Sequence, residues 1–347
     1  MGFPSLEELA GWIGLSDEEA VRALHARAYA VKSEVVGRRV SMRGLIEAGN
    51  VCAKDCRYCG IRASNAKVAR YRLSKEEIVS CARFAAESGY GSVVIQSGEI
   101  EGEAHARFVE DVLRAIAPLR LGVTLSLGEQ TEETYRRWRA AGATRYLLRI
   151  ETSNPALYAA LHPASCSFGR RVECLRALRR CGYQVGTGVM AGLPGQTLAD
   201  LARDIAFFHD IDADMIGMGP YIPHPDTPLA AEAADWSAET ALRLGLNMIA
   251  AARLALRDVN IAAATALQAL ADDGRERGVA AGANVVMPNV TAVAHRRDYR
   301  LYANKPCLDE NAALCRGCLQ RRIESIGETV LWGVPGDSAH FFARQNA

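Results

Sequence analysis

Residues 40–60 read VSMRGLIEAGNVCAKDCRYCG, a β-rich run that leads directly into three closely spaced cysteines. The first eight residues, VSMRGLIE (40–47), are largely apolar and are expected to form a strand. The cysteines Cys52, Cys56 and Cys59 follow with the spacing CxxxCxxC. Barrel enzymes place their active sites at the carboxyl ends of their strands, so this stretch predicts a metal site at the end of a first barrel strand.

The rest of the chain alternates short β-rich runs with longer amphipathic runs. Further strands are expected at 91–97, 122–128, 144–150, 184–192, 214–222, 260–266 and 283–289. Helices are expected at 74–89, 103–118, 131–142, 168–182, 197–210 and 237–256. Eight strands with intervening helices predict an α/β protein with a (β/α)8 TIM-type barrel. A doubly wound sheet is the alternative, but no strand ends in the GxGxxG pattern that opens a helix in that fold.

The pattern outside the barrel predicts two extensions. Residues 1–36 are expected to form an N-terminal helical extension, in which Ser16 followed by Glu19 fits a capping box. The barrel is expected over 37–300. Residues 301–347 are expected to form a C-terminal extension that carries further cysteines.

Composition narrows the class of protein. The 347 residues are 49% hydrophobic, and 41 basic residues balance 40 acidic ones. This balance gives no basic excess of the kind that nucleic-acid binders show. No run approaches the roughly 18 apolar residues of a membrane span, and the N-terminus lacks a signal-peptide pattern. We therefore expect a cytoplasmic protein that binds neither nucleic acid nor membrane.

Ten cysteines are many for such a chain, and in a reducing compartment clustered cysteines point to metal binding. Three thiolates on a four-iron cluster leave one iron open, which a reactive metal site requires. A zinc site is the alternative for Cys52, Cys56 and Cys59, but zinc usually takes four ligands and no fourth lies nearby in the sequence. A second group, Cys307, Cys315 and Cys318, could hold an iron–sulfur cluster, bind zinc or remain as free thiols.

The CxxxCxxC spacing, with Tyr58 before the last cysteine, resembles the radical S-adenosylmethionine (SAM) superfamily. The resemblance implies a [4Fe-4S] cluster whose open iron binds SAM, and reductive cleavage of SAM to a 5′-deoxyadenosyl radical. It also implies positions for the SAM contacts. The segment Ser97-Gly98-Glu99 would receive the methionyl amino group, Glu151 and Arg171 would contact the ribose or amino-acid part, and the turn containing Met190, Gly192 and Leu193 would lie near adenine.

Longer motifs are similar to those of the HydE family, the [FeFe]-hydrogenase maturases, along roughly residues 35–325. They are TLSLGE (124–129), YLLR (146–149), GLPGQT (192–197), GPYIPHPDTPL (219–229) and GANVVMPN (282–289). The family is similar in fold to biotin synthase and methylornithine synthase. The chain departs from it at two places. The family usually has Arg-His-Glu-Thr where this chain has Arg149-Ile150-Glu151-Thr152. It usually has Thr-Ala-Met-Gly where this chain has Thr265-Ala266-Leu267-Gln268.

Membership of this family would imply radical chemistry on a cysteine-bearing iron carbonyl–cyanide complex supplied by a partner maturase. It would also imply the other hydrogenase maturases as partners and an electron donor such as ferredoxin or flavodoxin. The residues expected to line the substrate cavity are Ser126, Arg149, Met218, Tyr221, Thr265 and Tyr302, and the candidate catalytic residues among them are Ser126, Arg149, Thr265 and Tyr302. Cys307, Cys315 and Cys318 would correspond to an accessory [2Fe-2S] or [4Fe-4S] site that some members carry.

Two other functions stay open from the sequence. A HydE-like paralogue could act on an amino acid or a small thiol or thioether, as methylornithine synthase acts on lysine. A non-catalytic iron–sulfur carrier would need the cysteines but not the residues expected to contact SAM.

Overall fold

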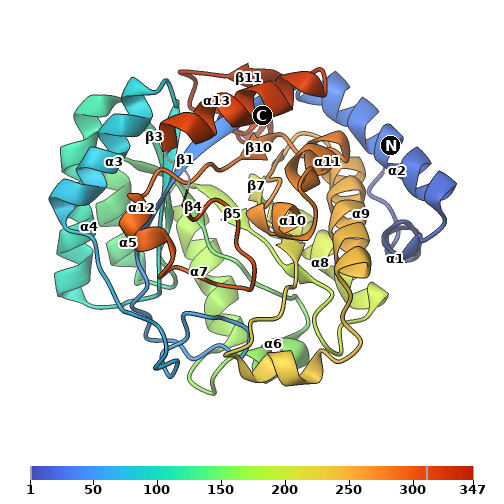
Figure 1. Ribbon diagram of the computed structural model, residues 1–347, viewed down its shortest axis with the longest axis horizontal. Helices are drawn as coiled ribbons and strands as arrows, with labels where there is room; N and C mark the ends of the chain where they lie inside the picture. The colour runs from blue at the N-terminus through green and yellow to red at the C-terminus, as the bar shows by residue number, and fades with distance from the viewer. Residues whose placement is uncertain (1, 310–311, 347) are drawn as a thin grey trace.

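Eight parallel strands close into a barrel (Figure 1). The computed structural model describes residues 2–309 and 312–346, with the backbone only for 312–315. In barrel order the strands are β1 (Arg39–Gly49), β2 (Ser92–Ser97), β3 (Gly122–Ser126), β4 (Ala143–Leu147), β5 (Gln184–Thr187), β7 (Met215–Ile216), β9 (Asn260–Ile261) and β10 (Val285–Val286). Val285 pairs with Ser41 of β1 on one side and with Ala262, just after β9, on the other. This double pairing closes the predicted barrel.

Amphipathic helices cover the outside of the barrel, as predicted. They are α3 (Lys75–Glu87), α4 (Glu103–Ile116), α5 (Glu132–Ala140), α7 (Phe168–Arg180), α8 (Leu198–Asp210) and α9 (Ala238–Leu256), with the shorter α6 (Pro155–Leu161), α11 (Gly274–Ala280) and α12 (Val293–Arg296) beside them. A hydroxyl side chain caps five of the six long helices at the N-terminus, and Ser74 of α3 and Thr197 of α8 form complete capping boxes. One large hydrophobic core joins the strands to these helices.

Most of the predicted strands are shorter than expected, and four are much shorter, among them 283–289, of which only Val285–Val286 forms a strand. The runs 184–192 and 214–222 each break, and their second parts form a separate pair, β6 (Met190–Ala191) with β8 (Gly219–Pro220). The break follows a close approach of two glycines, because a Cβ on Gly188 would lie 2.1 Å from the carbonyl oxygen of Gly217. The predicted strand 260–266 ends at Ile261, and Thr265 begins the helix α10 (Thr265–Leu270) instead.

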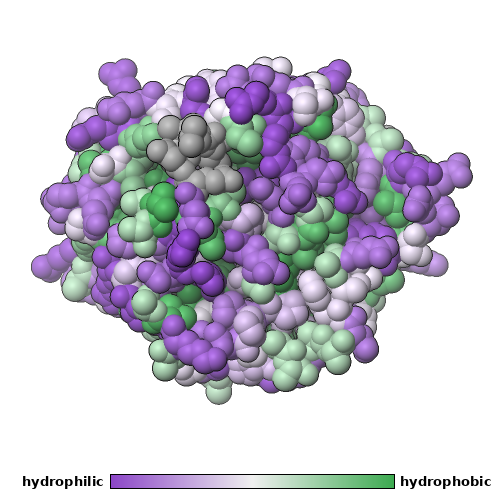
Figure 2. All heavy atoms as spheres, viewed as in Figure 1, coloured by the Kyte–Doolittle hydropathy of each residue, from purple (hydrophilic) through white to green (hydrophobic). Residues whose placement is uncertain are grey.

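The N-terminal extension consists of α1 (Leu6–Gly14), which packs on α8 and α9, and α2 (Glu18–Val35), which packs on α9. The predicted capping box of Ser16 and Glu19 is wrong, since Asp17 is the N-cap and its carboxylate accepts from Ala20 N. Asp17 directly precedes the first helical residue, so its carboxylate can accept from the third N–H of the helix, that of Ala20. Both helices lie at the right-hand edge of the view, where hydrophilic residues dominate the surface (Figure 2).

The C-terminal extension returns to the barrel. After α13 (Ala312–Ser325), β11 (Thr329–Leu331) pairs in parallel with the start of β1. Residues 333–338, here called the floor segment, then cross the N-terminal end of the barrel before α14 (Ala339–Gln345). Asp337 pairs with the fully buried Arg145 at 2.5 Å, and Gly336 O accepts from Arg43 and from Asn260. The floor segment therefore supplies partners to polar side chains inside the barrel.

Across the described ranges, no helix combines the length and the apolar character needed to span a membrane.

Candidate active site

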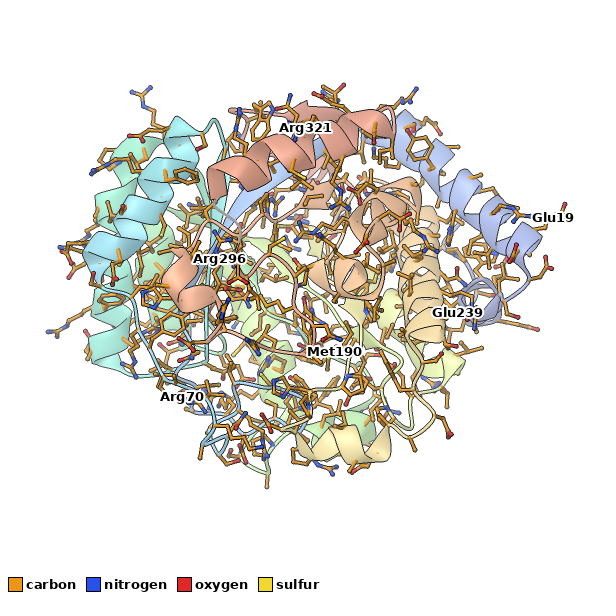
Figure 3. The ribbon with its side chains drawn as sticks, in the orientation of Figure 1. Glu19, Arg70, Met190, Glu239, Arg296 and Arg321 are labelled. Atoms are coloured by element: carbon orange, nitrogen blue, oxygen red, sulfur yellow. The ribbon has the colours of Figure 1, made fainter. Side chains whose placement is uncertain are left out.

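The loop that carries the first three cysteines follows β1 directly and is held by two side chains. Asn50 is fully buried, and its amide donates to Asp298 O at 2.6 Å and accepts from Tyr71 N at 2.8 Å. Arg70 donates to a ring of backbone carbonyls, among them Asn50 O and Ile61 O at 2.7 and 2.8 Å. Arg70 lies beside this loop at the lower left of Figure 3. These bonds fix both ends of the loop to the same edge of the barrel.

Cys52, Cys56 and Cys59 lie in this loop as half-buried free thiols. Burial raises the pKa of all three, to about 12 for Cys59, and the charges of Arg70 and Arg171 offset this rise only in part. Cys52 Sγ already accepts from the backbone N–H groups of Lys54 and Glu99, each at 3.4 Å.

These thiols fit an iron–sulfur cluster. Iron would supply the missing positive charge, and N–H donors to the ligand sulfur are a common way of tuning such clusters. Among the described residues no three ligands are gathered around the position of a single metal ion. A cubane places each thiolate on a separate iron, so its ligands stand further apart than those of one ion.

Glu99 connects the cysteine loop to the barrel wall. Its backbone oxygen accepts from Ala53 N at 2.8 Å, and its carboxylate lies 3.3 Å from Lys54 Nζ and 3.4 Å from Arg171 Nη2. Burial raises the pKa of this carboxyl group, and Arg171 offsets the effect only in part. Gly98 packs on the same loop, since a Cβ there would lie 2.3 Å from Val51 O. The predicted segment 97–99 therefore lies against the first cysteine.

Arg171 is buried on α7 between two carboxylates. Its Nε donates to the fully buried Glu129 at 2.6 Å, and its Nη1 donates to Arg149 O at 2.9 Å. Burial alone would lower the pKa of Arg171, but the charges of Glu99 and Glu129 outweigh it and raise the pKa well above its usual range. Gly128 precedes Glu129 with φ +78°, and a Cβ there would lie 2.0 Å from Glu99 Cγ. Only glycine lets the two carboxylates approach the same guanidinium group.

Glu151 stands in a strained conformation after β4. Its φ of +63° is rare for a residue other than glycine. The surroundings hold it there: Glu151 N donates to Gly188 O at 3.0 Å, and its carboxylate accepts from Arg149 Nη2 at 2.9 Å. Strain of this kind persists where a side chain must point in a required direction, which makes Glu151 a candidate ligand-binding residue. Ile150, between the two, is fully buried in the hydrophobic core.

A small apolar cluster lies on the other side of the cysteine loop. Leu161, Leu193, Tyr221 and Leu229 form it, and Tyr58 and Met190 pack against it. The turn after Met190 is shaped by Gln196, whose side-chain oxygen accepts from Gly192 N at 2.8 Å and from Leu193 N at 3.1 Å. Met190 lies below the centre of the view in Figure 3. The site thus has a charged half around Arg171 and an apolar half around Leu193.

This division fits SAM. The amino acid part of SAM is a zwitterion, which calls for a carboxylate and a guanidinium group together, and its adenine is a flat aromatic ring whose faces can pack on apolar side chains. Glu99 and Arg171 offer the first pair, and Met190 and Leu193 offer an apolar surface. The predicted contacts stay predictions, but the chain brings them to one edge of the barrel beside Cys52.

The residues predicted to line the substrate cavity come from three sides of the barrel mouth. Ser126 ends β3 and is partly buried, and Arg149 follows β4. Thr265 begins α10, where its hydroxyl accepts from Arg275 at 2.9 Å. Burial raises the pKa of the Tyr302 phenol, which lies near enough to Arg275 and Arg149 for both cations to oppose that shift.

The second cysteine group is described only in part. Cys307 has φ +61° and is half-buried, while Cys318 on α13 is exposed. The side chain of Cys315 lies outside the described residues.

Sequence reasoning passed over three residues that shape this site: Lys54, Glu129 and Arg275. Glu129 stood in the quoted motif TLSLGE, and its position directly after a strand with a preceding glycine was a usable signal. Lys54 carried no such signal because its contact with Glu99 joins residues far apart in the sequence, and no local pattern marked Arg275 as a buried cation.

Comparison with known proteins identifies the family. The radical SAM superfamily model matches residues 46–208. The chain is 43% identical over 322 residues to the [FeFe] hydrogenase maturase subunit HydE of Thermotoga maritima, covering 92% of this chain and 90% of that protein. It is 28% identical over 282 residues to 3-methylornithine synthase of Methanosarcina acetivorans, covering 81% and 78%. The fold matches the crystal structure of methylornithine synthase with a TM-score of 0.80 at 24% identity, over 95% and 94% of the two chains. The chain is thus a radical SAM enzyme, which uses a [4Fe-4S] cluster and SAM, and it belongs to the HydE family.

Proposed function

We propose that this enzyme acts as a HydE-type maturase in assembly of the diiron cofactor of [FeFe]-hydrogenase. Its [4Fe-4S] cluster would bind to Cys52, Cys56 and Cys59, and its substrate would be the cysteine-bearing iron complex handled by this family. When bound, the cluster and SAM supply a 5′-deoxyadenosyl radical. Ferredoxin or flavodoxin would deliver the electron, and the other hydrogenase maturases would supply the substrate and receive the product.

The position of Glu99 is the observation that carries the enzymatic part of the proposal. One residue donates its backbone N–H to Cys52 Sγ and presents its carboxylate beside Arg171. A ligand held by this pair is therefore held next to the cluster loop. A non-catalytic cluster carrier has no use for a buried carboxylate–guanidinium pair at that place, because burying such charges costs free energy.

The departures from the family pattern do not point to another substrate. Ile150 and Leu267 are both fully buried in the hydrophobic core, and Gln268 lies partly exposed on α10. The two apolar replacements thus fill the core and do not face the charged groups of the mouth. They give no reason to assign a different substrate.

Anaerobic complementation tests the proposal. Reconstituted protein replaces HydE in a mixture of the other maturases and apo-hydrogenase, and hydrogen evolution is followed. We expect activity well above the mixture that lacks any HydE. No activity with intact SAM cleavage would reject the maturase function and favour a paralogue that acts on a small thiol or an amino acid.

Two cysteine variants separate the clusters. Cys56→Ala is expected to abolish reductive SAM cleavage and the electron paramagnetic resonance signal of the SAM-binding cluster. Cys315→Ala is expected to leave both, since the proposed second cluster on Cys307, Cys315 and Cys318 is accessory. Retained cleavage in Cys56→Ala would contradict the cluster assignment.

A further inference from the structure

Arg275 is a buried cation that the site described above leaves unexplained. It lies at the start of α11, and only 3% of its surface is exposed. Its Nη2 donates to Thr265 Oγ1 at 2.9 Å, and its Nε is buried without a hydrogen-bond partner. In the described part of the chain no carboxylate pairs with it. The adjacent Glu276 is taken by Arg322.

Arg253, another buried arginine of this chain, is satisfied in a different way. Arg253 donates from all of its nitrogens, to the carbonyls of Gly282, Arg257 and Val259 and to the side chain of Asn284. Such an arginine bridges backbone segments and has a structural role. Arg275 makes a single hydrogen bond, to a hydroxyl group. Hydrogen bonds within the described protein therefore do not compensate for the free-energy cost of burying its charge.

The charges around the barrel mouth leave one cation in excess. Arg149 pairs with Glu151, and Lys305 pairs with Glu47. Arg275 lies at the same mouth, because its Nη2 bonds the hydroxyl of Thr265 at the start of α10, and its charge also opposes the rise in the pKa of the Tyr302 phenol. Its guanidinium group is therefore beside the predicted substrate residues Thr265 and Tyr302 and has no counter-ion among the described residues.

We propose that Arg275 binds a carboxylate, and that it receives the carboxylate of the amino acid carried by the substrate. This rests on the proposed function for the identity of that amino acid, but not for the chemistry of the subsite. A guanidinium group presents paired N–H donors that match the two oxygens of a carboxylate. Thr265 Oγ1 orients the group by holding Nη2. An amino-acid substrate would thereby be distinguished from an amine of the same length.

Two probes isolate this contact. S-methyl-L-cysteine carries the carboxylate and 2-(methylthio)ethylamine lacks it, while the methylated sulfur of both is a poor ligand for iron. Binding of each is measured by calorimetry on anaerobic, reconstituted, SAM-loaded protein. We expect the wild-type protein to bind the amino acid at least about 10-fold more tightly, as a charge-assisted hydrogen bond implies. In Arg275→Gln that ratio falls to within about twofold because only amino-acid binding weakens.

Thermal unfolding separates binding from structure. Glutamine can still bond Thr265 and removes an uncompensated buried charge, so Arg275→Gln should unfold at the same or a higher temperature than wild type. Arg275→Lys should keep an intermediate ratio. Arg322→Gln, which disturbs the neighbouring pair with Glu276, is the matched control and should keep the full ratio.

Three results would overturn the subsite: equal binding of the two probes by wild type, a full ratio in Arg275→Gln, or marked destabilisation of that variant. The maturation assay is independent of these outcomes. A protein that fails in maturation but discriminates the probes through Arg275 would lose the proposed function and keep the carboxylate subsite.

Discussion

Replacement of Asp337 by alanine would test how much the floor segment contributes to stability. The Asp337 carboxylate accepts from Arg145 Nη1 at 2.5 Å and from Gln184 Nε2 at 2.7 Å. The Arg145 side chain is fully buried, and Arg43 lies close by, where its hydrogen-bond partners among the described residues are a carbonyl and a thioether. Asp337→Ala would leave both guanidinium groups inside the barrel with no carboxylate beside them in the described structure.

The loss of stability follows from that geometry. Removal of one partner from a buried ion pair costs about 3–5 kcal/mol. Since 26% of the Asp337 side chain is exposed, solvent screens part of this, and we expect about 2–4 kcal/mol. Arg145 also lowers the pKa of Asp337 against the effect of burial. The contribution is therefore present above the unfolded pKa, near 4, and is lost as the pH falls through the lower folded value.

Urea unfolding of the apoprotein at pH 7 measures this loss. Asp235→Ala, at an exposed position, is the control and should change stability by less than about 0.5 kcal/mol. The double variant Arg145→Met, Asp337→Ala should recover part of the loss because it removes the stranded charge. A loss below about 1 kcal/mol in Asp337→Ala, or no recovery in the double variant, would refute the reasoning.

Two further predictions concern other parts of the molecule. Gly128→Ala would place a Cβ against the side chain of Glu99 and should weaken SAM binding at least about 10-fold. The control is Gly142→Ala, where φ is also positive (+118°) but the space around the new Cβ is open, and it should leave the SAM dissociation constant unchanged. Equal effects of the two variants would reject the clash with Glu99. His340 has its pKa raised to about 9 by Asp258 and Asp212, so its contribution to stability is complete below pH ~6.5 and is lost as the pH rises through 9. The melting temperature of His340→Gln should approach that of wild type between these values, and a constant difference up to pH 10 would contradict the pairing.

Local patterns predicted much of this protein. Strand and helix periodicity located the eight barrel strands, and the spacing of Cys52, Cys56 and Cys59 located the loop at the end of β1. These features depend on residues that are neighbours in sequence. The C-terminal ends of the later strands were predicted too long, since the break at Gly188 comes from its contact with Gly217, which no local pattern reveals.

The charges inside the barrel were the least predictable part. Arg145 in the predicted strand 144–150 reads as an ordinary polar position, and its partner Asp337 is 192 residues away. Arg171 was predicted to contact SAM, but its companion Glu129 was not singled out. A buried charge is recognised by what surrounds it, and those surroundings exist only once the barrel has closed.

Because of the floor segment, the barrel can close at its N-terminal end only after nearly the whole chain has been synthesised. Gly336 O meets Arg43 across 293 residues of sequence, so the first barrel strand leaves the ribosome long before its final partner is synthesised. Until then the N-terminal end of the barrel stays hydrated, and contacts of such long range form slowly. A truncated product would keep every cysteine ligand and every predicted SAM contact, yet lack a closed base.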